Sequence, residues 1–229
     1  MSVSDYFSTF CSNLRMSSDT VSTIQYRYHQ ITKRINLDYW SSSSETTHSL
    51  YVGSYGRGTE IWTSDIDIIV QLPYSTYEKF NAYKSNGQSA LLQEVKGVLQ
   101  KTYSTSYIKG DGQVIGINFS DGINFEIVPA FINTDGSYTY PDSNNGGSWR
   151  TTDPKKEIDA MNSRNKNTNK KVTYYRIFSI SYFLSLSCSS FCELRLLFSA
   201  LLVLPSALLV SSVSQVHHPH LLLKYTIPE

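Results

Sequence analysis

The stretch Ser64-Asp65-Ile66-Asp67-Ile68-Ile69-Val70 predicts a buried strand, because isoleucine and valine side chains favour a pleated, packed surface. The strand continues to Leu72 and ends at Pro73, which has no N–H to donate to a sheet. Side chains alternate between the two faces of a strand, so Asp65 and Asp67 share one face, roughly 7 Å apart. Two carboxylates this close repel each other unless a cation lies between them. Such oxygen ligands favour Mg²⁺, with Mn²⁺ as an alternative, whereas two solvated acids at a strand start need no metal.

Upstream lies the glycine-rich segment Gly53-Ser54-Tyr55-Gly56-Arg57-Gly58-Thr59. Its three glycines allow a tight turn whose backbone N–H groups can face phosphate oxygens. Ser54 adds a hydroxyl donor and Arg57 adds a cation, although a plain turn would have the same composition. The spacing and the missing lysine exclude a Walker A loop.

A third carboxylate is expected on a neighbouring strand, and the stretch Ile123-Asn124-Phe125-Glu126-Ile127-Val128-Pro129 provides it. Phe125 and Ile127 share the face that fills the core, while Asn124, Glu126 and Val128 share the other. Glu126 is either part of the carboxylate group or a partly buried glutamate in an ion pair. Three such acids beside a glycine-rich turn indicate phosphoryl or nucleotidyl transfer with two metal ions.

The remaining pattern up to residue 171 predicts an α+β fold with a mixed, mostly antiparallel sheet and flanking helices. Apolar residues three and four apart predict a helix over 19–38, with Ser18 or Asp19 as N-cap. A capping box, Ser75 to Glu78, predicts a second helix. The other expected elements are a strand over 48–52, a helix over 87–102, and strands over 104–109, 113–119 and 123–128, with turns at Asp111-Gly112 and Asp121-Gly122.

The composition narrows the class of protein. A net charge of +1 gives no overall electrostatic footprint for nucleic acid, so no long nucleic-acid substrate is expected. Cys11, Cys188 and Cys192 are too few and too scattered for a disulfide framework. Because the N-terminus lacks a basic start before an apolar run, we expect no signal peptide and a cytoplasmic protein.

The composition changes sharply near residue 171, which divides the chain into a domain over 1–171 and an apolar tail over 172–229. The run Leu196–Val213 has 18 uncharged residues, enough to span a membrane, but it contains Pro205 and several serines. Three interpretations of the tail stay open: a frameshifted reading, a membrane attachment through 196–213, and a buried terminal element.

Three motifs together resemble the DNA polymerase β-like nucleotidyltransferase superfamily: Gly53-Ser54, Ser64-Asp65-Ile66-Asp67, and Phe125-Glu126-Ile127-Val128-Pro129-Ala130-Phe131. More narrowly, the chain is similar to the bacterial relatives of cyclic GMP-AMP synthase and oligoadenylate synthase. That group makes cyclic or short oligonucleotide second messengers in anti-phage defence. Shorter stretches between residues 111 and 155 also resemble this group, and the resemblance covers about residues 1–170.

The resemblance implies a role for each motif residue. Asp65 and Asp67 would ligate two Mg²⁺ ions, and Glu126 would complete the catalytic and metal site and help to activate the acceptor hydroxyl. Glutamate at this third position departs from the aspartate often found in the superfamily. The donor triphosphate would contact Gly53 and Ser54, and further nucleotide contacts would come from Arg57 and Thr59.

The implied function is a metal-dependent nucleotidyltransferase that joins nucleoside triphosphates, ATP and GTP first among them, into cyclic di- or oligonucleotides. Pyrophosphate would be released, and a regulatory protein partner is a further expectation. Members of the group continue after the catalytic core with a helical half, which the tail over 172–229 does not resemble. Two alternatives therefore stay open: a truncated, inactive nucleotide-binding remnant, and a superfamily member of the tRNA or toxin–antitoxin type.

Overall fold

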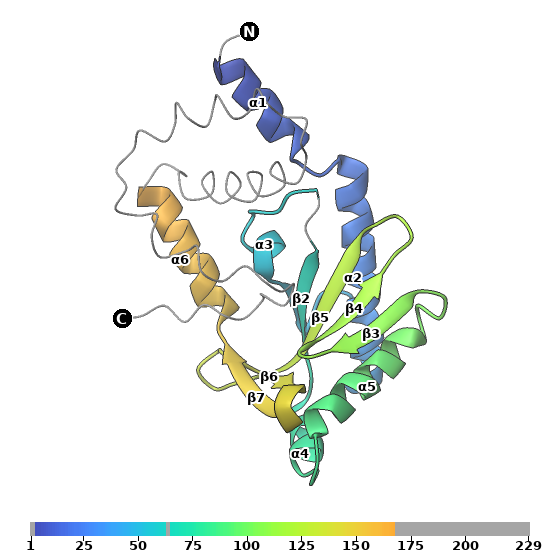
Figure 1. The fold of residues 1–229 in the computed structure, drawn as a ribbon. Coiled ribbons are helices and arrows are strands. Elements are labelled where there is room, and N and C mark those ends of the chain that lie inside the picture. Colours follow the sequence, from blue (N-terminus) through green and yellow to red (C-terminus); the bar gives the residue numbers. More distant parts are fainter. Residues whose placement is uncertain (1–2, 63–64, 168–229) are drawn as a thin grey trace.

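The computed structural model describes residues 3–62 and 65–167 (Figure 1), so the tail over 172–229 and its candidate membrane segment 196–213 lie outside the described residues. Within the described ranges, no helix combines the length and the apolar character needed to cross a membrane. The elements follow in the order α1 (Val3–Asn13), α2 (Ser18–Tyr39), β1 (Ser49–Tyr51), α3 (Gly53–Gly56), β2 (Ile66–Gln71), α4 (Tyr74–Asn81), α5 (Gly87–Gln100), β3 (Tyr107–Asp111), β4 (Val114–Asn118), β5 (Asn124–Ile132), β6 (Tyr138–Asp142), a 3₁₀ turn (Asn144–Gly146), β7 (Ser148–Thr152) and α6 (Pro154–Asn167).

The described strands form one seven-stranded sheet. Its main path runs β1-β2-β5-β4-β3, while β6 pairs with the far end of β5 and β7 pairs with β6. Among the described strand pairs, β2 with β5 is the parallel one and the others are antiparallel. The predicted α+β fold with a mixed, mostly antiparallel sheet is confirmed.

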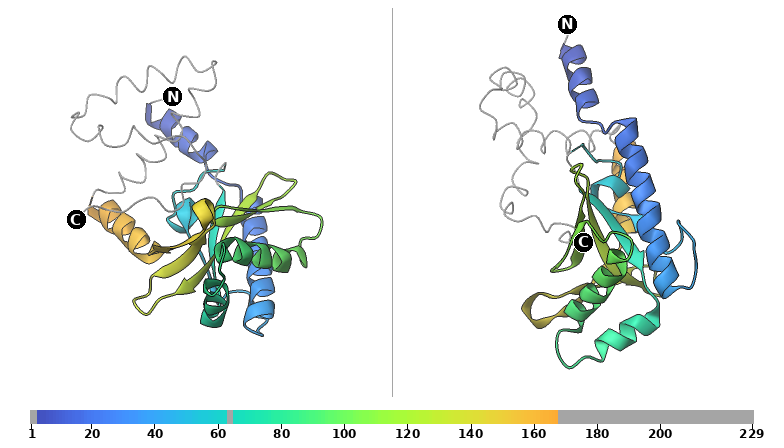
Figure 2. Two further views of the ribbon diagram at one scale, coloured as in Figure 1. Left: turned by 60° about the horizontal axis from the view of Figure 1, so that its bottom comes forward. Right: turned by 90° about the vertical axis from the view of Figure 1, so that its right-hand side faces the viewer.

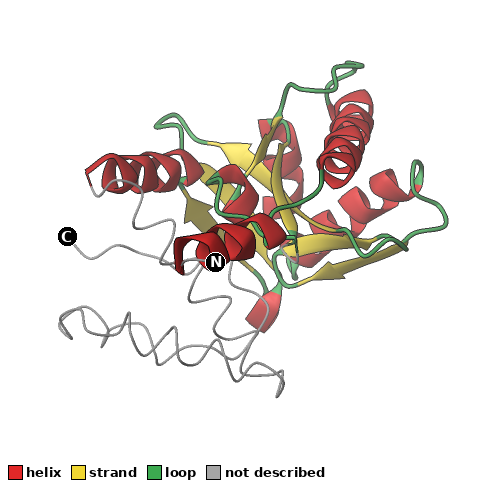
Figure 3. Cartoon of the chain, turned by 90° about the horizontal axis from the view of Figure 1, so that it is seen from above, coloured by secondary structure: helices red, strands yellow, loops and turns green. Residues whose placement is uncertain are grey.

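One face of the sheet carries the main hydrophobic core. The helix α2 runs along this face in Figure 2, and α4 and α5 pack beside it. Seen from above in Figure 3, the strands occupy the middle of the described fold and helices lie around them. The buried side chains that β2 and β5 contribute to this core are Ile66, Ile68, Val70, Phe125, Ile127 and Phe131.

The opposite face of the sheet has a smaller apolar cluster and stays partly polar. Because side chains alternate, Asp67 and Ile69 of β2 lie on this face together with Glu126 and Val128 of β5. The smaller cluster consists of Val52, Ile69, Val114, Val128, Ala130 and Tyr140. The assignment of Phe125 and Ile127 to the core, and of Glu126 to the other face, is confirmed.

Two predicted helix starts are wrong. Ser17, not Ser18 or Asp19, is the N-cap of α2, since its backbone is extended and its Oγ accepts a hydrogen bond of 3.1 Å from the Thr20 N–H. Ser18 is already helical, so its side chain is displaced from the cap position. The capping box at Ser75 does not form, because α4 begins at Tyr74 with Pro73 in the cap position and no side-chain cap.

The N-cap of α2 gives a testable prediction. Ser17→Ala removes the acceptor for the Thr20 N–H and is expected to cost about 1 kcal/mol of stability. In a chain of this length that change lowers Tm by about 2–4 °C. Ser18→Ala is the matched control and should leave Tm nearly unchanged in thermal denaturation. An equal loss in both variants would contradict the assignment of the cap.

Candidate active site

Asp67 and Glu126 lie directly opposite each other on neighbouring strands. The register of the parallel pair β2–β5 aligns Asp67 with Glu126, one strand spacing, about 4.8 Å, apart. Ile66 and Ile68 on one strand and Phe125 on the other are fully buried on the opposite face. A slip by one residue would expose this apolar set, so the core fixes the position of the two carboxylates.

The two carboxylates are electrostatically frustrated in the absence of a cation. Burial, with the charges of Glu126 and Asp65, raises the pKa of Asp67 to about 8, although Arg57 opposes the shift. Burial, with the charges of Asp65 and Asp111, raises the pKa of Glu126 to about 7. Neutralisation by a proton or a cation is therefore favourable at this point of the sheet, and hard divalent cations suit carboxylate oxygens.

Asp65 lies beside this pair but does not converge on it. It is exposed, precedes the first residue of β2, and its Oδ1 accepts a hydrogen bond of 3.3 Å from the Asn124 side chain. Within residues 3–62 and 65–167, no group of three or more His, Cys, Asp or Glu side chains has the arrangement needed to hold a metal ion. The structure thus brings Asp67 and Glu126 together, and the complete three-carboxylate ligand set stays a prediction.

The glycine-rich turn packs against the Asp67 carboxylate. Gly53 has a φ of 59°, and a Cβ built on it would lie 1.8 Å from Asp67 Oδ2. The backbone N–H of Val52 donates to the Asp67 carbonyl at 2.9 Å, which holds the turn against β2. Glycine is required here for two reasons, a positive φ and the close approach of a carboxylate.

The other residues of the turn make contacts within the protein. Arg57 Nη1 donates to Glu157 Oε2 of α6 at 3.2 Å. The Thr59 side chain is buried, and both its hydroxyl and its N–H donate to the Ser54 carbonyl. Ser54 is half-buried in α3. The nucleotide contacts expected of Gly53, Ser54, Arg57 and Thr59 stay predictions, and Thr59 would act by holding the turn.

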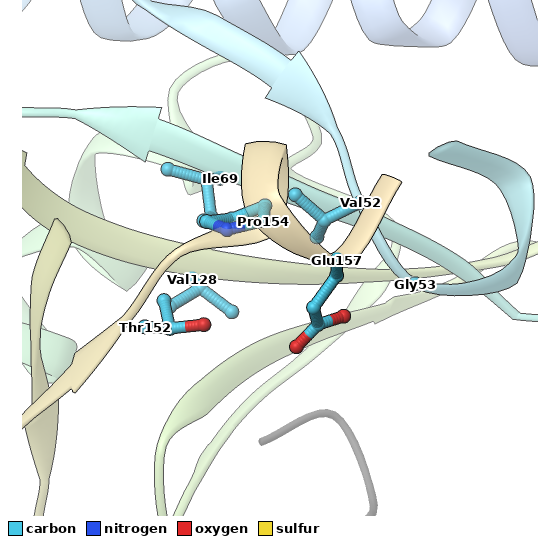
Figure 4. Close-up of a pocket in the computed structure, with 7 residues that line it drawn as sticks. All are labelled: Val52, Gly53, Ile69, Val128, Thr152, Pro154 and Glu157. Carbon is cyan, nitrogen blue, oxygen red and sulfur yellow. The ribbon is translucent and has the colours of Figure 1, made fainter. Parts of the chain in front are cut away.

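The start of α6 forms a wall next to the glycine-rich turn. No sequence pattern predicted this wall. Figure 4 shows a shallow pocket between the carboxylate face of the sheet and this first helical turn. The pocket is lined by Val52, Gly53, Ile69, Val128, Thr152, Pro154 and Glu157. No local pattern could have placed Glu157 here, because it contacts a residue 100 positions earlier in the chain.

The raised pKa of Asp67 predicts how stability depends on pH. A raised carboxyl pKa favours the folded state below the unfolded value near 3.8, and that contribution is lost as the pH rises towards about 8. Asp67→Asn carries no charge and should therefore gain stability relative to the parent chain over this range. Near pH 8, in a chelator, we expect a gain in Tm of about 2–4 °C, the change that about 1 kcal/mol gives in a chain of this size.

Thermal denaturation at a series of pH values checks this, with Asp121→Asn as the opposite control. The Arg27 hydrogen bond holds the pKa of Asp121 below its usual range, so Asp121→Asn should be less stable than the parent chain above the ordinary carboxyl pKa, and the difference should shrink in acid. Parallel behaviour of the two variants would disprove the assignment.

The contact between Gly53 and Asp67 gives a second prediction for the site. Gly53→Ala places a methyl group against the carboxylate, so the rise in Tm on adding Mg²⁺ or Mn²⁺ should be lost. Gly58→Ala is the matched control, since Gly58 also has a positive φ but a Cβ there meets nothing within 4 Å. The control should lose only about 1 kcal/mol through backbone strain and keep the cation response. Cation-dependent differential scanning fluorimetry distinguishes the two, and an intact response in Gly53→Ala would contradict the role of this contact.

Two of the solved structures that share the fold show the extent of the likeness. The cyclic dinucleotide synthase CdnE of Elizabethkingia meningoseptica, solved with GTP and Apcpp, has a TM-score of 0.53 at 16% identity, over 71% of this chain and 60% of that chain. The c-UMP-AMP synthase CdnE of Rhodothermus marinus, solved with Apcpp and Upnpp, has a TM-score of 0.51 at 15% identity, over 78% of this chain and 66% of that chain. The chain thus spans less than two thirds of the length of either structure, and at these identities the likeness concerns the fold alone.

A search of curated protein sequences found no match. The family model of the Second Messenger Oligonucleotide or Dinucleotide Synthetase domain matches residues 1–165. This match covers most of the chain and includes both carboxylate strands and the glycine-rich turn. The resemblance inferred from the motifs is thereby confirmed, and the chain belongs to the Second Messenger Oligonucleotide or Dinucleotide Synthetase domain family.

Proposed function

We propose that this chain is a divalent-metal-dependent nucleotidyltransferase that joins nucleoside triphosphates into a cyclic di- or oligonucleotide. The single observation that carries the proposal is the Asp67–Glu126 pair: the two half-buried residues lie opposite each other, and the Asp67 carboxylate packs against the Gly53 turn. Membership of the synthetase family supports the nature of the reaction. A purely structural role for two apposed carboxylates is disfavoured, because burial penalises the charge of both and the Glu126 charge adds to the penalty at Asp67.

The reaction is an in-line displacement. A hydroxyl oxygen of the acceptor sugar forms a bond to the α-phosphorus of the donor triphosphate, while the bond from that phosphorus to the β-phosphate bridging oxygen breaks. Pyrophosphate leaves with the electron pair, and the hydroxyl proton passes to the Glu126 carboxylate and on to water. Repeating the step within the linear product closes a ring. The protein contributes mainly positioning and charge complementarity.

Asp67 and Glu126 are the residues that fit a divalent cation, and Asp65 is the candidate third ligand. Asp65 is exposed, and its carboxylate accepts a hydrogen bond of 3.3 Å from Asn124. A bound cation supplies positive charge for the triphosphate and the leaving pyrophosphate. The Gly53 turn brings backbone N–H groups and Ser54 next to this point, where the β- and γ-phosphates of the donor would lie. Mg²⁺ is the expected ion, two per site, and Mn²⁺ is the alternative.

The substrates are nucleoside triphosphates, with ATP and GTP as first candidates. This choice is supported by the two structural neighbours, one solved with GTP and Apcpp and the other with Apcpp and Upnpp. We extend the proposal to a role in anti-phage defence and to a regulatory protein partner, both of which the resemblance implies, and to a cytoplasmic location. The alternatives are a nucleotide-binding remnant without activity and a tRNA or toxin–antitoxin nucleotidyltransferase.

The direct test is product formation by the full chain of 229 residues. It is incubated with labelled ATP, GTP, CTP and UTP plus Mg²⁺ or Mn²⁺, treated with phosphatase, and the products are separated. We expect a phosphatase-resistant product that falls by roughly a hundredfold or more in Asp67→Asn and in Glu126→Gln.

Glu78→Gln is the matched control, since Glu78 is exposed on α4, which packs on the other face of the sheet. Its activity should equal that of the parent chain. A product that survives in Asp67→Asn would disprove the site. No product at all, with nucleotide binding still detectable by a thermal shift, would favour the inactive remnant.

A further inference from the structure

Gly116 lies in the middle of β4, immediately beside Glu126. The antiparallel register of β4 and β5 aligns Gly116 with Glu126, and the register of β3 and β4 aligns Gly116 with Lys109. One row across the sheet therefore reads Asp67, Glu126, Gly116 and Lys109. All four lie on the face that carries the carboxylates. Because Gly116 has no side chain, the sheet surface beside Glu126 is bare at this position, and this bare surface is called the floor below.

The protein's own packing does not require glycine at this position. A Cβ built on Gly116 would have its nearest neighbours, Asn118 Oδ1 and the Lys109 carbonyl, both at 3.9 Å, an ordinary contact distance. The φ of Gly116 is not positive either. Gly110 on the adjacent strand provides a contrast, because its Cβ would lie 3.2 Å from Gln93 of α5 on the core face. Glycine inside a strand weakens the sheet and often marks close approach of a ligand, and at Gly116 packing offers no other reason.

The far side of this open floor is bordered by groups suited to a nucleotide. Tyr107, Lys109 and Asp111 of β3 share the carboxylate face, since they alternate with the buried Ile108. The Tyr107 ring is 66% exposed at the edge strand, where it offers a surface for stacking a base. Lys109 is exposed, and its ammonium group forms an ion pair with Asp111. Asn118, opposite Tyr107 on β4, adds an exposed amide to the same face of the sheet.

We propose that the acceptor nucleotide lies over Gly116, with its reacting hydroxyl at Glu126 and its base on Tyr107. The proposal rests on the function proposed above and names the side of the site that the acceptor occupies. The donor triphosphate lies under the Gly53 turn on the opposite side of the carboxylate pair, next to Asp67. Two nucleotides placed in this way meet at Asp67 and Glu126, which is the geometry that an in-line displacement needs. Gly116 then sets the space available to the acceptor sugar, and Tyr107 and Asn118 lie next to its base.

Gly116→Val is the decisive variant. Valine suits a strand, and its Cβ has room in the protein, so the variant should fold with an unchanged or higher Tm. Its side chain fills the floor where the acceptor would lie. The full chain is assayed with labelled ATP as donor and AMP, GMP, CMP or UMP as acceptor, and the KM values of donor and acceptor are measured separately. We expect kcat/KM for the acceptor to fall by roughly tenfold or more, while the donor KM stays within about twofold.

Gly97→Val is the matched control. Gly97 also has open space around its Cβ, but it lies on α5, which packs on the core side of the sheet. The control should leave both KM values unchanged. A second pair tests the base contact: Tyr107→Ala should raise the acceptor KM by roughly tenfold, and Tyr26→Ala should not. Tyr26 is equally exposed, at 66%, but belongs to α2.

The outcomes separate the inference from the function on which it rests. If the parent chain makes no product with any donor and acceptor, the proposed function fails and the acceptor site fails with it. If the parent chain is active and Gly116→Val keeps the acceptor KM, the acceptor site alone is disproved. Should Gly116→Val fail to fold, the Tyr107→Ala and Tyr26→Ala pair decides, and equal KM values in these two would overturn the proposal.

Discussion

The position of Asp67 opposite Glu126 depends on the parallel pairing of β2 with β5. Parallel neighbours cannot be joined by a short turn, so the chain between them forms α4, α5 and the hairpin β3–β4. The register of the pair is fixed on the core face, where Ile66, Ile68 and Phe125 are fully buried. A one-residue slip would move this apolar set to the other face and separate the carboxylates. Hydrophobic burial on one face thus determines the geometry of the charged groups on the other.

The arrangement has a cost in the absence of a cation. The Gly53 turn, packed on the Asp67 carboxylate, helps to exclude water from it, and burial is the main cause of its raised pKa. The charges of Glu126 and Asp65 add to the shift. Apposed, desolvated carboxylates weaken the fold near neutral pH, and functional sites often retain groups that are unfavourable for stability. A divalent cation would offset this cost and would make the fold and the proposed chemistry depend on the same ion.

One face of the sheet packs the main hydrophobic core, and the other face carries the residues proposed for the chemistry. Three helices, α2, α4 and α5, bury the core face. At one end of the other face, the start of α6 forms a wall next to Ile69 and Val128, and an ion pair between Arg57 and Glu157 links the glycine-rich turn to the helix. Between this wall and the edge strand β3 lies the row that contains both carboxylates and Gly116. The sheet therefore offers two sides to a pair of substrates, one under the turn and one over Gly116.

Local sequence rules determined much of this chain: the strands β2 and β5, the helices α2 and α5, the glycine turn, and the face on which each carboxylate lies. These follow from side-chain alternation and helical periodicity, which depend on residues a few positions apart. Only the tertiary structure decided that β2 and β5 are parallel with Asp67 beside Glu126, that Asp65 turns to Asn124, and that α6 meets Arg57. It also placed the N-cap of α2 at Ser17 instead of the predicted Ser18 or Asp19, and it paired the polar strands β6 and β7, which have little apolar pattern of their own. For the β2–β5 pairing and the contacts of Asp65 and Arg57, the physical reason is that register and close approach depend on residues 59 to 100 positions apart, which no local pattern contains.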